Sequence, residues 1–277
     1  MSRTTRRTFL AASAAIAAVP AVSAVTAEEH HWDDVRLGVA TYSLREFSRA
    51  EAIQIVQSLG VKYVNVKSMH MPYEASLEEL AAARAQFEGA GLQIVAGGNV
   101  DLKGDETFVK TMLTYAKNAG IPTVVCAPAH DNLGIVEKYA RQLSLKIAIH
   151  NHGPEDQYFP NGASVINRVK NMDPCMGLCY DVGHAARTGV DLIEEIEMAG
   201  DRLHDMHVKD LTSFEDRSSQ VEAGKGKIPF AQIFRTLKRM RYPGFVNLEY
   251  EINAKAPQQG MAESFAYMRG VLDGQAS

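Results

Sequence analysis

Four short apolar runs in the second half of the chain decide the fold, because each of them ends in His, Asp or Glu side chains. They read Ile147-Ala148-Ile149-His150-Asn151-His152, Leu178-Cys179-Tyr180-Asp181-Val182-Gly183-His184, His204-Asp205-Met206-His207-Val208-Lys209-Asp210 and Val246-Asn247-Leu248-Glu249-Tyr250-Glu251. Runs of this kind, each followed by a helical pattern, are typical of the strands of β/α units. The carboxyl ends of parallel strands lie at one edge of a sheet, so we expect these polar side chains to meet there.

The same alternation of strand and helix patterns extends along the rest of the chain. Strand-like runs recur about every 30 residues, which is the length of one β/α unit. The expected strands are Arg36–Tyr42, Val61–Lys67, Leu92–Ala96, Pro122–Ala127, Lys146–His150, Met176–Asp181, Leu203–Val208 and Phe245–Tyr250. Eight such units in succession predict a single-domain (β/α)8 TIM barrel over residues 28–277.

Local signals agree with helices between these strands. Ser48 and Ser76 each precede a Glu three residues later, which is the pattern of a capping box at a helix start. A doubly wound open sheet is the competing fold, and it normally carries a glycine-rich phosphate loop after its first strand. Here that position reads Ala40-Thr41-Tyr42-Ser43-Leu44-Arg45 without a glycine, which favours the barrel.

The first 27 residues predict a signal peptide of the twin-arginine type. Thr5-Arg6-Arg7-Thr8-Phe9-Leu10 precedes an alanine-rich stretch, and small residues around Ala24 and Ala27 fit a cleavage site. The apolar stretch is too short for the roughly 20 residues of a membrane-spanning helix, so we expect no stable membrane anchor. The predicted location is the periplasm.

Composition excludes other classes of protein. The chain has 29 Lys and Arg against 33 Asp and Glu, a net charge of −4 that becomes −7 once the three arginines of residues 1–27 are removed. A chain with a net negative charge is poorly suited to bind the phosphate backbone of nucleic acids, so we expect no nucleic-acid partner. Three cysteines, an odd number, do not form a disulfide framework. If Asp181 points into the barrel, the two-residue period of a strand places Cys179 there too.

The strand-end residues together predict a metal site. A set of imidazoles and carboxylates without thiolate suits Mn²⁺, Co²⁺, Fe²⁺ or Zn²⁺ better than Ca²⁺. We therefore expect one divalent ion, with manganese favoured and cobalt, iron, zinc or magnesium as alternatives. Any one of these histidines alone would be read as a hydrogen-bonded core residue. His150 and His152 face the same way, so both stay candidates for the fifth-strand ligand.

With these motifs in place, the chain resembles the xylose isomerase-like TIM-barrel superfamily, in its sugar phosphate isomerase/epimerase branch. The resemblance rests on Asp181-Val182-Gly183-His184, Met206-His207-Val208-Lys209-Asp210, Leu248-Glu249-Tyr250-Glu251, Gly224-Lys225-Gly226-Lys227-Ile228 and Tyr242-Pro243-Gly244. It implies a metal set of His150, Asp181, His207 and Glu249. His150 stands where the epimerases of the superfamily carry Glu. The resemblance also implies a contact with substrate or water for His184.

The resemblance implies a metal-dependent sugar isomerase or epimerase that acts on a keto-sugar or related polyol through an enediolate. The epimerases use two glutamates on opposite faces of the substrate, so the imidazole at His150 counts against two-faced epimerisation and leaves one-faced chemistry open. One alternative is a lyase or dehydratase acting on a 3-keto-glycoside or an inosose. A non-catalytic exported sugar-binding protein is the alternative from another class.

Candidate catalytic and substrate-binding residues lie next to the proposed ligands. Lys209 and Glu251 each follow a ligand by two residues and should face the same cavity, and His152 is the next candidate. Lys209 needs a lowered pKa to act as a base, or it serves as an acid or oxyanion partner. Lys67 and Tyr42 end the first two strands and are expected to bind substrate. The expected partner is a small carbohydrate, and a homo-oligomer is an open alternative to a monomer.

Overall fold

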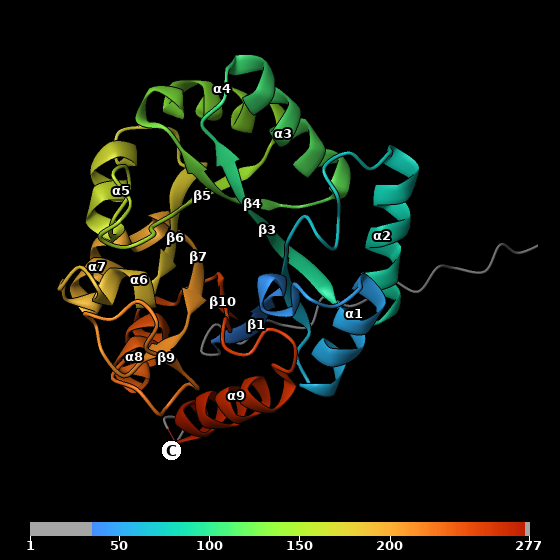
Figure 1. Ribbon diagram of the computed structural model, residues 1–277. Coiled ribbons are helices and arrows are strands. Elements are labelled where there is room, and N and C mark those ends of the chain that lie inside the picture. The colour runs from blue at the N-terminus through green and yellow to red at the C-terminus, as the bar shows by residue number, and fades with distance from the viewer. Residues whose placement is uncertain (1–34, 275–277) are drawn as a thin grey trace, which may run out of the picture. The chain divides into compact units, whose positions relative to one another are not determined.

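The structure is a computed structural model that describes residues 35–274, and it contains a closed barrel of eight parallel strands (Figure 1). The strands follow one another around the barrel in chain order, and β10 pairs with β1 to close it. They are β1 (Arg36–Ala40), β2 (Tyr63–Val66), β3 (Gln93–Leu102), β4 (Thr123–Pro128), β5 (Lys146–His150), β6 (Met176–Asp181), β7 (Leu203–Val208) and β10 (Phe245–Leu248). The predicted TIM barrel is confirmed, while the predicted signal peptide of residues 1–27 lies outside the described residues.

Helices surround the barrel (Figure 1). They are α1 (Arg49–Ser58), α2 (Leu77–Gly89), α3 (Glu106–Ala119), α4 (Leu133–Leu143), α5 (Gly162–Val169), α6 (Val182–Ala186), α7 (Leu192–Ala199), α8 (Phe230–Met240) and α9 (Gln258–Asp273), with short 3-10 helices η1 (Thr41–Leu44), η2 (His130–Asn132) and η3 (Gly200–Arg202). Both capping boxes predicted at Ser48 and Ser76 are present at the starts of α1 and α2. Each box satisfies backbone N–H groups that the first helical turn leaves unpaired.

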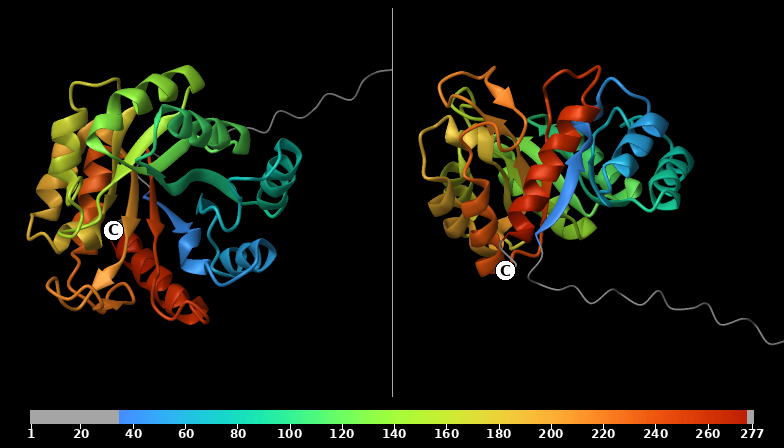
Figure 2. Two further views of the ribbon diagram at one scale, coloured as in Figure 1. Left: turned by 45° about the horizontal axis from the view of Figure 1, so that its top comes forward. Right: turned by 90° about the horizontal axis from the view of Figure 1, so that it is seen from below.

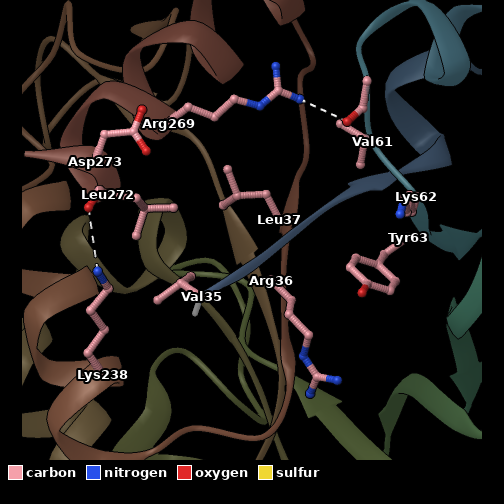
Figure 3. A pocket seen from close by; sticks show the side chains of 11 residues that line it. Val35, Arg36, Leu37, Val61, Lys62, Tyr63, Lys238, Arg269, Leu272 and Asp273 are labelled. Carbon is pink, nitrogen blue, oxygen red and sulfur yellow. Dashed lines mark hydrogen bonds between the residues drawn. The ribbon is translucent and has the colours of Figure 1, made fainter. Parts of the chain in front are cut away.

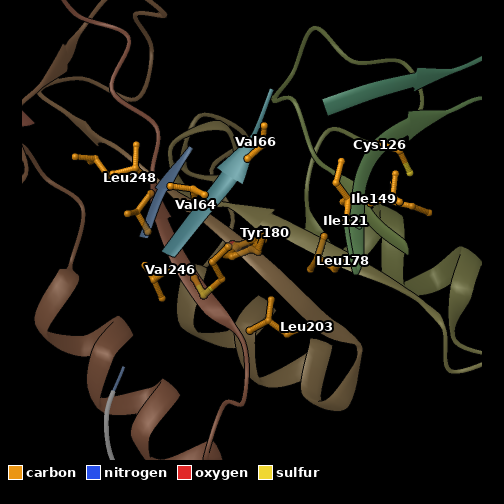
Figure 4. Packing of buried hydrophobic residues seen from close by; sticks show 14 of the residues in the cluster. Val64, Val66, Ile121, Cys126, Ile149, Leu178, Tyr180, Leu203, Val246 and Leu248 are labelled. Atoms are coloured by element: carbon orange, nitrogen blue, oxygen red, sulfur yellow. The ribbon is translucent and has the colours of Figure 1, made fainter. Parts of the chain in front are cut away.

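The strands bury two different faces. Alternate residues such as Val64, Ile149 and Tyr180 point outward and form the main apolar core with the helices (Figure 4). The residues between them point into the barrel, where Ala96, Val125, Ala148 and Cys179 form a separate buried cluster. The expectation that Cys179 faces the interior is confirmed. This interior layer lies directly beneath the strand ends that carry the polar side chains.

A small hairpin of β8 (Asp210–Leu211) and β9 (Gln220–Val221) stands at the carboxyl end of the strands (Figure 2). The Asp210 carboxylate accepts hydrogen bonds from the backbone N–H groups of Gly224, Gly226 and Ile228. A side chain at Gly226 would collide with that carboxylate. The Gly224–Ile228 loop is therefore held around an acidic side chain, and these N–H groups are not free to bind a phosphate.

Several strand ends differ from the sequence prediction. Tyr42 lies in η1 rather than β1, and β10 ends at Leu248 instead of Tyr250. Beyond Leu248, the side chain of Gln220 replaces strand pairing, because it donates to the Glu249 carbonyl oxygen and accepts from the Glu251 N–H. β3 is longer than predicted, and its register with β4 shifts between Gly97 and Val100. No helix within residues 35–274 is both long and apolar enough to cross a membrane.

Candidate metal centre

Four buried side chains from consecutive barrel strands meet at the carboxyl end of the barrel. His150 ends β5, Asp181 ends β6, His207 lies in β7, and Glu249 follows β10. Their candidate ligand atoms all lie within 4.8 Å of one another. His150 Nε2 is 3.1 Å from His207 Nδ1 and 3.5 Å from Asp181 Oδ2, and His207 Nδ1 is 3.5 Å from Glu249 Oε1. The structure thus brings together the four residues that the sequence predicts as ligands.

These residues fit a divalent cation. Asp181 Oδ2 is buried and accepts no hydrogen bond from the described residues, although it lies 3.1 Å from Lys209 Nζ. Lys209 Nζ also lies 2.7 Å from Glu249 Oε2 and 2.9 Å from Glu251 Oε2. Three carboxylates around one ammonium leave a net negative charge, which a divalent cation would offset. Two imidazoles and two carboxylates supply the nitrogen and oxygen donors that such ions take.

The pKa values suit ligation at three of the four positions. Burial and the neighbouring His152 keep the pKa of His150 well below its ordinary value, so its imidazole is neutral. Burial alone would raise the pKa values of Asp181 and Glu249, but Lys209 and the neighbouring histidines hold both below the ordinary range. Burial also acts to lower the pKa of His207, yet Glu249 and Asp205 raise it overall. An ion that binds through this ring would therefore compete with a proton.

A polar network beneath the cluster orients His207. Asn65 Nδ2 lies 2.9 Å from His207 Nε2 and donates to Asp205 Oδ2 at 3.1 Å, while Asn247 Nδ2 donates to Asp205 Oδ1 at 2.8 Å. Burial raises the pKa of Asp205 to about 7. Contacts to the second ring nitrogen of a histidine fix the ring orientation, and here they direct Nδ1 toward the other three ligands.

Lys209 does not have the lowered pKa that a lysine base requires. Burial by itself would lower the pKa, but Asp181, Glu249 and Glu251 raise it well above the ordinary value. Its side chain is 5% exposed, and a Cβ at Gly183 would collide with its aliphatic stem. Lys209 is therefore a fixed ammonium group beside the candidate ligands, and the use of this residue as a base is not supported.

A cavity of about 730 Å³ opens above the cluster. Its volume lies in the usual range for small-molecule sites, about 300–1,000 Å³. His150 and Glu249 form part of its lining, together with all six of the other predicted site residues, which are Tyr42, Lys67, His152, His184, Lys209 and Glu251. The side chains predicted from separate strand ends therefore surround one cavity.

His152 lies outside the group of four, although its ring centroid is 4.3 Å from that of His150. His152 Nδ1 is 3.3 Å from Asp156 Oδ2, and Nε2 is 2.7 Å from Asn99 Nδ2. Two backbone N–H groups, of Tyr158 and Phe159, donate to Asp156 as well. Although burial acts to raise it, the pKa of Asp156 falls to about 2 because of these hydrogen bonds and His152. His150, rather than His152, therefore lies in the cluster, and His152 forms an Asp–His pair on the cavity wall.

The remaining predicted residues also lie on the cavity wall. Lys67 Nζ is 5.1 Å from the centroid of the Tyr42 ring and 3.4 Å from the Asn99 carbonyl oxygen. Burial lowers the pKa of Lys67. The backbone N–H of His184 donates to Asp181 Oδ1 at the start of α6, which fixes the orientation of that carboxylate.

Sequence reasoning missed Asn99 and Asp156. Asn99 lies at the register shift in β3 and lines the cavity. The alternation of apolar residues along a strand does not predict such a shift. Asp156 lies four residues after His152, in a loop where spacing carries no information about side-chain direction. The one sequence signal that could have identified Asp156 is an acidic residue shortly after a histidine at a strand end.

A second cavity, of about 400 Å³, lies at the opposite end of the barrel, because residues at the amino ends of β1 and β2 line it. Figure 3 shows its lining side chains. Lys238 and Arg269 on its wall donate to backbone carbonyl oxygens of Leu272 and Gly60. Both groups of candidate metal ligands found within residues 35–274 lie at the carboxyl end of the strands. The candidate metal centre is therefore at that end.

Comparison with known proteins agrees with this fold. Residues 53–271 match the family described as "Xylose isomerase-like TIM barrel". An uncharacterized protein of Methanocaldococcus jannaschii is 27% identical over 89 residues, which span 31% of this chain and only 30% of that protein.

Several solved structures share the fold at low sequence identity. D-psicose 3-epimerase is 20% identical with a TM-score of 0.69, over 86% of this chain and 99% of that one. The 3-keto-D-glucoside 4-epimerase YcjR of E. coli is 16% identical with a TM-score of 0.70, over 86% and 100%. The IOLI protein, solved with a bound zinc atom, is 18% identical with a TM-score of 0.71, over 87% and 99%. At these identities the likeness shows the fold.

Proposed function

Because the chain belongs to the xylose isomerase-like TIM-barrel family, we propose that it is a divalent-metal-dependent enzyme of the sugar isomerase or epimerase type. The observation that carries this proposal is the buried cluster of His150, Asp181, His207 and Glu249 beneath a cavity of sugar-binding size. Two of the similar structures are named as epimerases, one for D-psicose and one for 3-keto-D-glucoside, which supports a keto-sugar substrate.

The four clustered residues would hold the ion, and the residues around the cavity would handle protons. When bound, the ion would polarise a substrate ketone and stabilise the enediolate that forms on proton removal. Glu251 follows β10, whereas His152 follows β5, and two strands separate β10 from β5 in the barrel. The two residues therefore face the cavity from different sides, as a reaction that removes and returns a proton on opposite faces requires.

His152 is organised for proton transfer. Asp156 lies beside Nδ1, which favours the tautomer that carries its proton there and leaves Nε2 as the acceptor. The amide of Asn99 lies 2.7 Å from Nε2, as expected for a donor to an unprotonated nitrogen. In this proposal His152 serves in place of the carboxylate that the superfamily epimerases carry on the fifth strand. Two-faced epimerisation is then available to this chain in spite of His150.

One observation favours a lyase or dehydratase as the second candidate function. Lys209 is an ammonium whose raised pKa keeps it protonated, and it lines the cavity beside Glu251. Elimination next to a ketone breaks the C–O bond of the departing hydroxyl or alkoxide, and the adjacent ammonium can transfer a proton to that oxygen as the bond breaks. An inosose or a 3-keto-glycoside would be the substrate class of such a reaction.

We further propose that the protein is exported by the twin-arginine route and works in the periplasm. The Arg6-Arg7 pair and the alanine-rich stretch behind it support this location. Twin-arginine export carries folded proteins, so an ion such as Mn²⁺ would bind in the cytoplasm, before Cu²⁺ and Zn²⁺ compete on affinity.

The test is turnover by metal-replaced protein, followed by NMR in deuterated water. Ketoses, inososes and 3-keto-glycosides are incubated with protein loaded with Mn²⁺, Co²⁺ or Zn²⁺. Deuterium at the carbon next to the carbonyl, with an isomer or epimer as product, is the expected result. An unsaturated product or a released aglycone would favour the lyase. Binding without any exchange, in every metal form, would contradict both and leave the non-catalytic sugar-binding protein.

A further inference from the structure

We propose that Cys179, with His150 and His207, forms a second coordination site on the floor of the metal centre, and that this site takes thiophilic ions. The proposal concerns which ions the chain binds and through which atoms. It does not depend on the reaction that the protein catalyses. It rests on the position of one buried thiol relative to two candidate ligands.

Strand register places Cys179 directly beside His150. The two residues are paired across β5 and β6, and Cys179 is also paired with Asp205 across β6 and β7. The thiol Sγ and one ring nitrogen from each of His150 and His207 lie within 4.8 Å of one another. All three side chains are buried, so an ion between them would be shielded from water.

The thiol lies deeper in the barrel than the carboxylates. Asp181 stands two residues beyond Cys179 on β6, toward the carboxyl end of the strand, and Glu249 lines the cavity. Cys179 does not line the cavity, because it packs lower in the barrel against Ala96, Val125 and Ala148. An ion can therefore bind through the histidines and the carboxylates above, or through the histidines and the thiolate below.

Ligand chemistry separates the ions that would choose each site. Carboxylates suit Mn²⁺ and Mg²⁺, whereas thiolate with imidazole suits Zn²⁺ and softer ions such as Cd²⁺. The bond that forms below is metal–sulfur, and the thiol proton leaves to solvent as it forms. Because both sites use the same two histidines, an ion in one excludes an ion from the other.

The position of Lys209 is a second reason why a thiophilic ion would bind in the lower site. Its ammonium already lies close to Asp181, Glu249 and Glu251, so an ion in the upper site must share these carboxylates with a fixed positive charge. An ion in the lower site leaves those ion pairs undisturbed. A thiophilic ion is thus expected to displace Mn²⁺ from the protein without making contact with the cavity.

The experiment is a Cd²⁺ titration of the metal-free full-length mature protein, followed by ultraviolet absorption. The parent should develop a thiolate-to-cadmium charge-transfer band that saturates at one ion per chain. In Cys179→Ala the band should vanish and Cd²⁺ should bind about tenfold or more weakly. The matched control is Cys126→Ala, because Cys126 is equally buried but belongs to the outer core, so that variant should keep the band.

Two further measurements test the separation of the sites. Mn²⁺ binding, followed by electron paramagnetic resonance, should survive in Cys179→Ala, while Asp181→Asn should lose Mn²⁺ and keep the cadmium band. Absence of the band in the parent overturns the proposal without reference to any variant. Its persistence in Cys179→Ala, or its loss in folded Asp181→Asn, overturns it as well.

Discussion

Replacing Lys209 by Met tests the electrostatic account of the metal centre. The ammonium lies within 3.1 Å of oxygen atoms of Asp181, Glu249 and Glu251. Methionine fills much of the same space against Gly183 but carries no charge. In the metal-free protein the substitution leaves these carboxylates without their shared cation, so we expect a marked loss of stability.

The magnitude follows from burial. Lys209 is 5% exposed and Asp181 is fully buried, whereas Glu251 is 39% exposed and its pair with Lys209 counts for little. Removing one partner of a buried ion pair costs about 3–5 kcal/mol. In a domain of this size each kcal/mol moves the melting temperature by about 2–4 °C, so we expect a decrease of about 6–20 °C. A divalent ion restores positive charge at the same place, so it should stabilise the variant more than the parent.

The assay is thermal unfolding of parent and variant, first in chelator and then in a saturating concentration of Mn²⁺. Lys67→Met is the matched control, because Lys67 lines the same cavity and forms no ion pair with any residue in the range 35–274. Burial lowers the pKa of Lys67, so its charged form is a cost to the fold and its removal should leave the melting temperature equal or higher.

Three results would refute this reasoning. Metal-free Lys209→Met that melts within about 2 °C of the parent would show that the carboxylates do not need the ammonium. An equal decrease in Lys67→Met would show that the loss reflects cavity packing rather than charge. If Mn²⁺ raises the melting temperature of Lys209→Met less than that of the parent, the lysine and the ion do not compensate the same charges.

The other predictions concern the metal, proton transfer, acid stability and export. Asp181→Asn should reduce the metal content from about one ion per chain to nearly none by elemental analysis, and retention of full metal would remove Asp181 from the ligand set. Glu251→Gln and His152→Gln should each keep the metal and lose at least about tenfold in turnover, equivalent to about 1.4 kcal/mol of barrier; parent-like rates would exclude them as proton carriers. Burial lowers the pKa of His204 from 6.5 to about 4, so between these pH values the ring takes up a proton in the unfolded state but not in the folded state. The free energy of unfolding is therefore unaffected by this group above pH 6.5 and decreases by about 3 kcal/mol as the pH falls toward 4. In His204→Gln, the free energy of unfolding measured with urea should therefore decrease less between pH 6.5 and 4 than in the parent. A decrease as steep as in the parent would contradict this prediction. Replacing Arg6 and Arg7 by Lys should retain the precursor in the cytoplasm, as cell fractionation would reveal, and normal export would argue against the twin-arginine route.

Much of the fold could be predicted from sequence because its signals are local. Strand-like runs recur at the length of a β/α unit, and the capping boxes at Ser48 and Ser76 predict two helix starts to the residue. The strand-end positions of Asp181, His207 and Glu249 are local information too, because a parallel barrel collects all its strand ends at one edge.

Only the tertiary structure shows which of His150 and His152 lies in the cluster of candidate ligands. Both face the same way along the chain, but register pairs His150 with Cys179 beside Asp181, whereas Asn99 and Asp156 hold the ring of His152 on the cavity wall. Asn99 comes from a strand two places away in the barrel, and its contact depends on a register shift. No pattern within a few residues of His152 contains that information.

The charge state of Lys209 is also decided by the tertiary structure alone. Sequence shows a lysine two residues after a histidine ligand candidate, and that spacing fits an acid or a base equally well. The direction of its pKa shift depends on carboxylates of Asp181, Glu249 and Glu251, which are 28 to 42 positions away along the chain. Periodicity and caps act over a few residues, so the sequence by itself determined the barrel and the end at which polar groups gather. The Coulomb interaction acts through space, so only the folded chain decides which of those groups is a ligand, a base or a fixed charge.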